Sequence, residues 1–224
     1  MVATLESRAL QASQCNAVLV EALSWLLQDE MDHRSSGLRQ RRFKASGLTE
    51  LKTLTEFDWS FNPKLPKREI YELVTAKFIQ NGEHALLIGA PGTGKSHIAK
   101  TIAHASIQLF QKTVYREAHV FFEDMFEAEQ TGKTKKVLKL FSEADLLIID
   151  DLFLRKRMPS DAADYLLDII INRYSKRKST VITSNRPIED WGLLLKDNAA
   201  SSAILDRLLH HGHLLKFEGK SYRL

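Results

Sequence analysis

The sequence predicts an α/β fold in which helices cover both faces of a parallel sheet. Five apolar runs of strand length alternate with longer stretches of helical pattern, and they cover residues 84–88, 113–115, 146–149, 180–183 and 214–217. Strands that alternate with helices imply crossover connections and therefore a parallel sheet. A glycine-rich turn follows the first of these strands, and two carboxylates follow the third. Ligands of open α/β sheets bind at this carboxyl edge, so the site is expected there.

Length and composition allow one such domain and a smaller helical region. The chain has 224 residues, 32 Lys and Arg against 28 Asp and Glu, and one cysteine, Cys15. A single cysteine excludes an intramolecular disulfide, a CxxC pair and a cysteine zinc cluster. No apolar run approaches the roughly 20 residues of a membrane span. We therefore expect a cytoplasmic protein that does not enter the membrane.

The segment before the sheet has a different pattern. Residues 17–31 carry apolar side chains at helical spacing, and five basic residues without an acidic one follow between positions 34 and 44. Three aromatic residues alternate at Phe57, Trp59 and Phe61 before Asn62 and Pro63 break the pattern. We predict a helical region for interaction with partners and DNA over residues 1–60, and the α/β domain over residues 61–224.

The turn after the first strand fits the phosphate-binding pattern G-x-x-x-x-G-K-[ST]. It is formed by Gly89, Ala90, Pro91, Gly92, Thr93, Gly94, Lys95 and Ser96. An apolar strand precedes it and a helical pattern follows, as this P-loop motif requires. The glycines let backbone N–H groups point inward at a helix N-terminus, where phosphate is favoured. We expect Lys95 to reach the β and γ phosphates of ATP, and Ser96 to bind Mg²⁺ through its hydroxyl oxygen.

Polar side chains at the ends of two further strands complete the predicted site. Asp150 would hold Mg²⁺ and Asp151 would polarise the attacking water. Asn185, which follows the strand at 180–183, would orient this water or sense the γ phosphate. Each has a simpler interpretation: Asp150 and Asp151 as capping or surface carboxylates, and Asn185 as the residue that closes the turn before Arg186 and Pro187.

With these motifs in order, the chain resembles the AAA+ ATPases, and specifically the IstB-like transposition helper ATPases, which are relatives of the DnaC helicase loaders. The resemblance covers roughly residues 35–224. It is carried by the P-loop together with residues 52–54, 57–59, 150–151, 183–185, 205–208 and 221–223. It implies a RecA-like sheet of five parallel strands, a ring or helical oligomer formed on DNA with ATP, and a transposase of the same mobile element as partner.

The resemblance also suggests roles for three side chains. By position, Asn185 resembles sensor 1, and Arg207 resembles the arginine finger that reaches the ATP of a neighbouring subunit. The simpler interpretation of Arg207 is a surface arginine paired with Asp206. Arg223 resembles sensor 2 and would also contact the nucleotide.

Further basic clusters favour contact with DNA phosphates. They comprise Lys133, Lys135, Lys136 and Lys139; Arg155, Lys156 and Arg157; and Arg173, Lys176, Arg177 and Lys178. Any one of them could be merely a solvated face. Because no helix-turn-helix or zinc-finger pattern is present, we expect nonspecific binding of duplex DNA through its backbone. A helicase loader would share every nucleotide-binding residue, and a small-molecule P-loop kinase is a further alternative.

Overall fold

The computed structural model describes residues 2–15, 17–154 and 158–222. The chain divides into two compact units, residues 1–42 and residues 43–224. Each unit is described by itself. No helix of the described ranges is long and apolar enough to cross a membrane.

The first unit consists of helix α1 (Val2–Gln14) and most of helix α2 (Leu19–Ser46). The Arg8 guanidinium donates from Nε and Nη2 to the two carboxylate oxygens of Asp29, at 2.7 and 2.6 Å, and so ties α1 to α2. This paired hydrogen bonding holds the pKa of Asp29 below its usual range. The helix predicted at 17–31 is confirmed from Leu19 onward. It extends through the basic stretch to Ser46, because that stretch contains no proline and its Arg, Leu, Gln and Lys residues are good helix formers.

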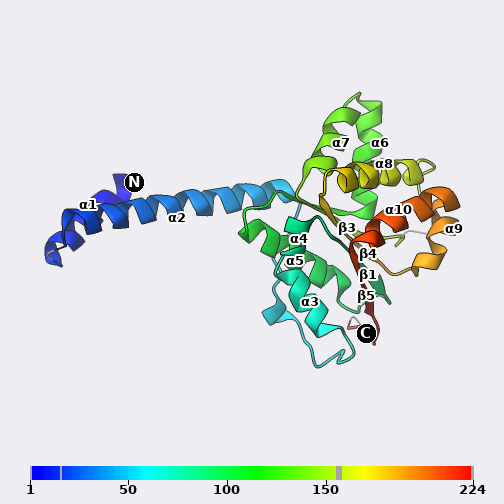
Figure 1. Cartoon of the computed structure of the whole chain (residues 1–224), viewed down its shortest axis with the longest axis horizontal. Helices are drawn as coiled ribbons and strands as arrows, with labels where there is room; N and C mark the ends of the chain where they lie inside the picture. Colours follow the sequence, from blue (N-terminus) through cyan, green and yellow to red (C-terminus); the bar gives the residue numbers. More distant parts are fainter. Residues whose placement is uncertain (1, 16, 155–157, 223–224) are drawn as a thin grey trace. The chain divides into compact units, whose positions relative to one another are not determined.

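The second unit is built on the predicted five-stranded parallel sheet (Figure 1). The strand order is β2-β3-β4-β1-β5, so the strand that leads into the P-loop has neighbours on both sides. The strands are β1 (His84–Gly89), β2 (Thr113–Glu117), β3 (Leu146–Leu152), β4 (Ser179–Ser184) and β5 (Gly212–Phe217). Each matches one of the apolar runs in the sequence.

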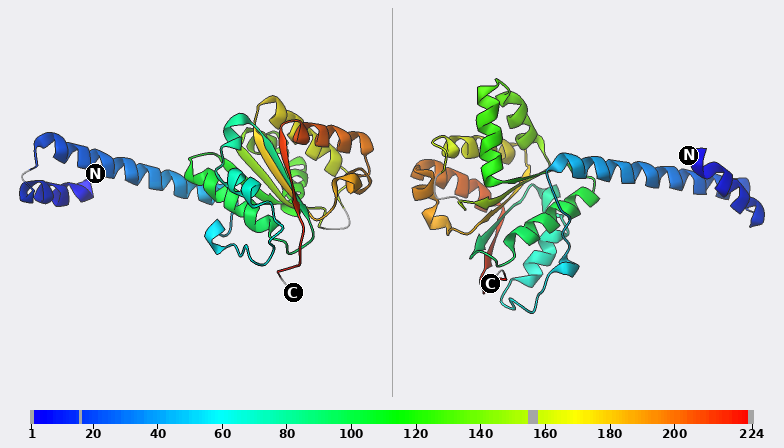
Figure 2. Two further views of the ribbon diagram at one scale, coloured as in Figure 1. Left: turned by 60° about the horizontal axis from the view of Figure 1, so that its bottom comes forward. Right: turned by 180° about the vertical axis from the view of Figure 1, so that it is seen from behind.

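Helices cover both faces of this sheet, as Figure 2 shows. One face is covered by α3 (Lys67–Val74), α4 (Phe78–Asn81) and α5 (Lys95–Gln108). The other face is covered by α6 (Ala118–Gln130), α7 (Thr134–Glu143), α8 (Ala162–Ser175), α9 (Trp191–Leu195) and α10 (Asn198–His210). Two short 3-10 turns, Leu54–Glu56 and Ile188–Asp190, complete the described elements.

Alternation of side chains along the strands separates two apolar cores. In β1, Ala85 and Leu87 belong to the core under α3 and α5, whereas Leu86 belongs to the core under α6 to α10. Apolar residues on both faces are expected in parallel strands, which are covered on both sides. The sheet therefore has a fixed position between two helical layers, and its carboxyl edge is held in place.

Residues 43–60 are grouped with the sheet, whereas the sequence-based boundary lies between residues 60 and 61. Leu48 is buried in the core under α5, and Phe43, Leu54, Phe57 and Trp59 pack against that core. Burial of these apolar side chains against the α/β unit explains the grouping. The assignment of residues 1–60 to partner and DNA interaction remains a prediction.

The fold corrects the prediction for Arg173, which is one of the four residues of a basic cluster. Arg173 has no exposed surface and donates to the carbonyl oxygens of Phe141, Ala144 and Ser179 and to the Thr180 hydroxyl. A buried guanidinium needs this many acceptors because burial without them is costly. Arg173 therefore joins the ends of α7, α8 and β4, and cannot contact DNA.

Candidate functional site

The P-loop connects the end of β1 to the start of α5. Gly94 is the residue that caps α5, and Lys95 is the first residue of the helix. The loop turns sharply at Gly92, whose φ of +76° is readily adopted by glycine. Thr93 is buried and stabilises the loop by donating from Oγ1 to the Ala90 carbonyl at 2.8 Å. The predicted phosphate-binding turn is thus formed at a helix N-terminus.

Lys95 lies within this turn. Its side chain is 4% exposed, and Nζ donates to the carbonyl oxygens of Gly89 and Ala90 at 2.7 and 2.8 Å. The ammonium group is therefore held beside the N-terminal amides of α5. A cation and a helix N-terminus together favour a bound phosphate.

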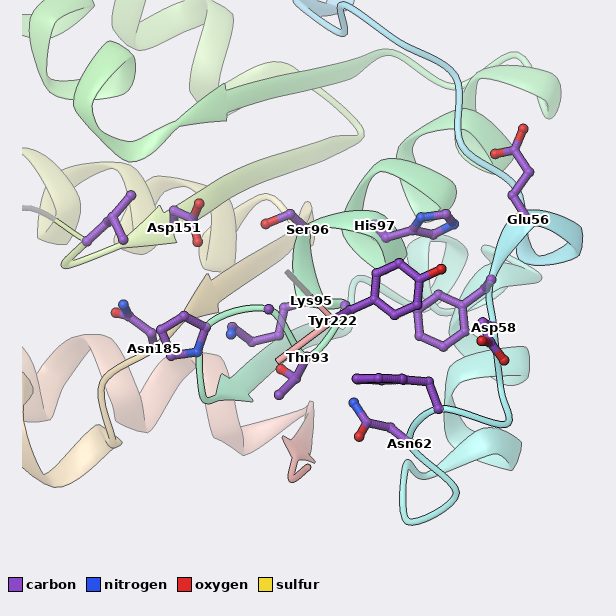
Figure 3. Close-up of a pocket in the computed structure, with 16 residues that line it drawn as sticks. Glu56, Asp58, Asn62, Thr93, Lys95, Ser96, His97, Asp151, Asn185 and Tyr222 are labelled. Atoms are coloured by element: carbon purple, nitrogen blue, oxygen red, sulfur yellow. The ribbon is translucent and has the colours of Figure 1, made fainter. Parts of the chain in front are cut away.

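A cavity of about 230 Å³ opens at the P-loop and brings several predicted residues together. Figure 3 shows Lys95 and Thr93 in the middle of the pocket, with Asp151 and Asn185 on one side and Tyr222, Asp58 and Asn62 on the other. Its lining comprises Glu56, Phe57, Asp58, Phe61, Asn62, Pro91, Gly92, Thr93, Gly94, Lys95, Ser96, His97, Asp151, Leu154, Asn185 and Tyr222. Phe61, whose ring packs against that of Tyr222, also lines the cavity, and we call the end at Tyr222 the aromatic end and the end at Asp151 the polar end.

Asp150 is buried at the end of β3 and is held from both neighbouring strands. One carboxylate oxygen accepts a hydrogen bond from the Tyr115 hydroxyl of β2, at 2.5 Å, and the other accepts from the Thr183 hydroxyl of β4. Burial, together with the negative charge of Asp150, raises the pKa of Tyr115 above its ordinary value, so this phenol remains a donor. The carboxylate is oriented by the sheet itself.

Asp151 follows in an unusual backbone conformation. Its φ is +57°, and its N–H donates to the Thr183 hydroxyl at 2.8 Å. This turn directs Asp151 into the cavity, whereas Asp150 remains buried among the strand ends. The two adjacent carboxylates therefore have different surroundings, as different roles require.

Asn185 lies beside β3 because β3 and β4 are neighbours in the sheet, as expected. Within the described part of the chain, its buried Oδ1 atom has no hydrogen-bond partner. Buried polar atoms are nearly always paired, so an unpaired acceptor in a cavity lining favours a donor on a bound ligand or water. The interpretation of Asn185 as a mere turn residue does not account for this atom.

The donor set suits Mg²⁺. Mg²⁺ binds few protein groups, prefers oxygen ligands and retains several waters. A carboxylate has about four acceptor positions, so Asp150 keeps capacity for a cation beside its two hydroxyl partners. Ser96 adds a hydroxyl to the cavity lining. Across residues 2–15, 17–154 and 158–222, no cluster of three His, Cys, Asp or Glu side chains suggests another type of metal site.

Of the predicted residues that the structure describes, Gly89, Ala90, Asp150 and Arg207 are not among those that line this cavity. Arg207 lies on α10, where Nη1 donates to the Ala203 carbonyl one turn earlier at 2.8 Å. It is not among the described residues that line the cavity of its own chain. Arg223, like the basic cluster 155–157, lies outside the described residues.

The structure also adds residues for which the sequence predicted no role in the site. Tyr115 orients Asp150, and its place opposite Ile148 in the pairing of β2 with β3 is the signal that could have found it. Tyr222 and Asn62 come from opposite ends of the α/β unit and line the same cavity, and Asn62 bonds to Lys220, two residues before Tyr222. No local pattern predicts this contact.

Known proteins of similar sequence are named for ATP binding. The family model described as IstB-like ATP binding protein matches residues 1–224. A protein of Geobacillus stearothermophilus named for ATP binding in insertion sequence IS5376 is 36% identical, over 95% of this chain and 84% of its own. The corresponding protein of insertion sequence IS21 in Pseudomonas aeruginosa is 30% identical, over 98% of this chain and 82% of its own.

Solved structures show the same fold at lower identity. The DnaC helicase loader is 20% identical with a TM-score of 0.59, over 80% of this chain and 99% of its own. DnaA from Aquifex aeolicus bound to AMPPCP is 22% identical with a TM-score of 0.60, over 76% of this chain and 51% of its own. The fold is that of the AAA+ proteins. The family match over every residue, with two insertion-sequence relatives at 30% identity or above, shows that the chain belongs to the IstB-like ATP-binding proteins.

Proposed function

We propose that this protein is an ATP-hydrolysing AAA+ regulator that assembles on DNA and assists the transposase of the same mobile element. The observation that carries the proposal is one cavity that joins the P-loop, Asp151 and the unpaired acceptor of Asn185. Membership in a family of insertion-sequence ATP-binding proteins supports the choice of partner. The likeness to DnaC concerns the fold alone, so the transposition role is preferred to helicase loading.

In this proposal, different residues bind the phosphates, hold Mg²⁺ and activate the water that attacks the γ phosphate. Lys95 and the N-terminal amides of α5 bind the β and γ phosphates, while Ser96 and Asp150 hold Mg²⁺. When bound, Mg²⁺ neutralises negative charge that develops on the phosphates. Asp151 orients and polarises the attacking water, and Oδ1 of Asn185 accepts a hydrogen bond from this water. These positions lie on one side of Lys95 in Figure 3, so the water would approach from that side.

Assembly completes the site in this proposal. Arg207 does not reach the cavity of its own chain, and a cationic side chain on α10 of a neighbouring subunit would stabilise the charge on the transferring phosphoryl group. Hydrolysis then depends on contact between subunits. Exposed lysines of the α6–α7 region and the basic stretch of α2 would contact the DNA backbone without reading bases.

The test uses two variants with opposite expected defects. Lys95→Ala should lose ATP binding in titration calorimetry, because its ammonium faces the phosphates, whereas Lys112→Ala, an exposed lysine, should bind normally. Asp151→Asn should bind ATP and hydrolyse it slowly, because only water activation is removed. ATP affinity of Lys95→Ala within about threefold of the wild type would refute the nucleotide site.

The proposed assembly on DNA and the proposed assistance of the transposase are tested by separate measurements. ATP turnover should rise with duplex DNA and with protein concentration, since assembly supplies Arg207. Target joining by the transposase encoded in the same element should increase when this protein and ATP are added, and Asp151→Asn should alter that response. A turnover rate indifferent to DNA and concentration, with phosphoryl transfer to a small acceptor, would favour a kinase instead.

A further inference from the structure

A segment after β5 crosses the P-loop and is held there by contacts from distant parts of the sequence. We call residues 218–222 the strap. The Tyr222 N–H donates to the Gly92 carbonyl at 2.9 Å. At Gly92 a Cβ atom would lie 2.2 Å from Ser221 Oγ, so the strap approaches the P-loop more closely than a side chain there would allow.

Asn62 fixes the middle of the strap. Its Nδ2 donates to the Lys220 carbonyl at 3.3 Å, and its Oδ1 accepts from the Lys220 N–H at 3.2 Å. A side-chain amide has the donor and acceptor of a peptide group, so this pairing imitates one rung of a strand ladder. Asn62 is 5% exposed and also begins a turn in which its carbonyl accepts from Leu65 N–H at 3.2 Å.

The backbone of the strap at Gly219 leaves room for the side chain of Asn62. Gly219 has a φ of +145°, in a region that disfavours other residues, and a Cβ atom there would lie 2.1 Å from Asn62 Oδ1. The ring of Phe61 meets the ring of Tyr222 edge to face, with centroids 5.0 Å apart. Asn62 and Tyr222 line the nucleotide cavity at the end remote from Asp151 and Asn185 (Figure 3). Phe61, which packs against Tyr222, lines the same cavity.

We infer that Asn62 is a positioning residue that clamps the strap over the P-loop and so builds the wall of the cavity that receives the nucleoside part of ATP. The inference rests on the proposed function, since it assigns the aromatic end of the same cavity. The polar end holds the phosphates, and the aromatic faces of Phe61 and Tyr222 suit a base, which stacks on aromatic side chains. Loss of the clamp should therefore affect recognition of the nucleoside more than recognition of phosphate.

The experiment compares ATP with inorganic tripolyphosphate, both with Mg²⁺, by titration calorimetry on the full chain. Asn62→Ala removes both hydrogen bonds, and Asn62→Asp keeps the shape but sets a carboxylate against the Lys220 carbonyl. Each should raise the Kd of ATP roughly tenfold, as the loss of buried hydrogen bonds predicts, and leave the Kd of tripolyphosphate within about twofold. Turnover at saturating ATP should change little, because Asp151 and Asn185 are untouched. Asn172→Ala, an exposed asparagine on α8, is the control and should change neither Kd.

Gly219→Ala tests the clamp from the side of the strap. It should reproduce the selective loss of ATP affinity, and the Asn62→Ala/Gly219→Ala double variant should be no worse than either single variant, because the two changes break one contact. The fitted stoichiometry reports the folded fraction separately from Kd. Equal losses for ATP and tripolyphosphate, or additive effects in the double variant, would overturn the inference.

The two proposals fail differently. If the wild type does not bind ATP, or if Lys95→Ala binds it normally, the proposed function is wrong. If the wild type binds ATP and Lys95→Ala does not, but both Asn62 variants bind ATP within about twofold of the wild type, only the role of Asn62 is refuted.

Discussion

The carboxylate of Asp150 illustrates how single side chains set up this site. Both of its oxygens accept hydrogen bonds, one from Tyr115 and one from Thr183, and both donors come from strands adjacent to β3. Partners of this kind orient a metal ligand without touching the metal, and their loss typically weakens metal affinity by about 10- to 100-fold. The position of Asp150 therefore depends on three neighbouring strands, β2, β3 and β4.

A Tyr115→Phe variant should bind Mg²⁺ less well while keeping the fold, because it removes one hydroxyl and little volume. The Mg²⁺ concentration for half-maximal ATP turnover should rise about tenfold. Turnover at saturating Mg²⁺ should recover most of its value. Tyr174→Phe, which removes a hydroxyl paired with His210, is a matched control and should leave the Mg²⁺ dependence unchanged. A normal Mg²⁺ dependence in Tyr115→Phe would remove Tyr115 from the support of the metal ligand.

At the scale of the elements, the start of β1 depends on a neutral histidine. His84 is 1% exposed, and its Nδ1 accepts from the Thr180 N–H of β4 at 3.1 Å. Burial, with further effects from Arg173 and His211, lowers the pKa of His84 from 6.5 to about 4. The unfolded chain thus binds a proton in a pH range where the folded chain does not.

Stability should therefore fall as pH decreases from 6.5 towards 4, by about 3 kcal/mol from this group alone. His84→Asn keeps an acceptor for Thr180 but cannot take up the proton, so its free energy of unfolding should be less sensitive to pH in this window. Urea unfolding of both proteins at several pH values measures the difference. His33→Asn, an exposed position, should behave as the wild type. Parallel pH profiles for wild type and His84→Asn would show that His84 does not titrate as stated.

The basic stretch of α2 leads to a prediction for DNA binding. If Arg41, Arg42 and Lys44 each neutralise a phosphate, their joint replacement by alanine should reduce the slope of log affinity against log salt by about 2.7, at roughly 0.9 per contact. Fluorescence anisotropy with duplex DNA at several salt concentrations measures the slope. A matched variant at Lys133, Lys135 and Lys136, all exposed, tests the alternative surface. An unchanged slope in the first variant and a reduced one in the second would move the contact to the α6–α7 region.

The elements were largely predictable from the sequence, and the residues that join distant elements were not. Apolar runs bounded by turns reveal parallel strands, and the P-loop is a contiguous motif, so both could be identified locally. Arg173 could not be distinguished from a surface arginine because its acceptors come from α7 and β4. The contact of Asn62 with Lys220 spans 158 positions and has no local pattern. Long-range hydrogen bonds of this type become visible only once the sheet order is known.

At the scale of the whole molecule, the proposed role of Arg207 predicts that ATP turnover requires contact between subunits. Arg207→Ala should bind ATP normally and hydrolyse it poorly, since a finger supplied by a neighbour can contribute about 10³- to 10⁵-fold in rate. Lys95→Ala has the opposite defect, an inactive pocket with an intact Arg207. A mixture of the two variants should regain part of the turnover of the wild type, because some pockets would meet an intact Arg207.

The mixture must be measured with duplex DNA, and light scattering must show that the variants assemble together. Arg68→Ala, an exposed arginine on α3 of the same unit and outside the basic clusters, controls for loss of positive charge and should retain normal turnover. Normal turnover by Arg207→Ala alone would exclude Arg207 from catalysis. Proven joint assembly without recovery would show that it does not act on a neighbouring pocket.

The backbone at Asp151 limits how this site can change during evolution. A positive φ is tolerated by Asp and Asn, whose short polar side chains can bond locally, better than by longer residues. An exchange of Asp151 for Glu would lengthen the side chain by one methylene. It would also place a residue that disfavours positive φ in this turn and so raise the strain of the backbone. The shorter acid and the geometry of the loop are therefore expected to be inherited together.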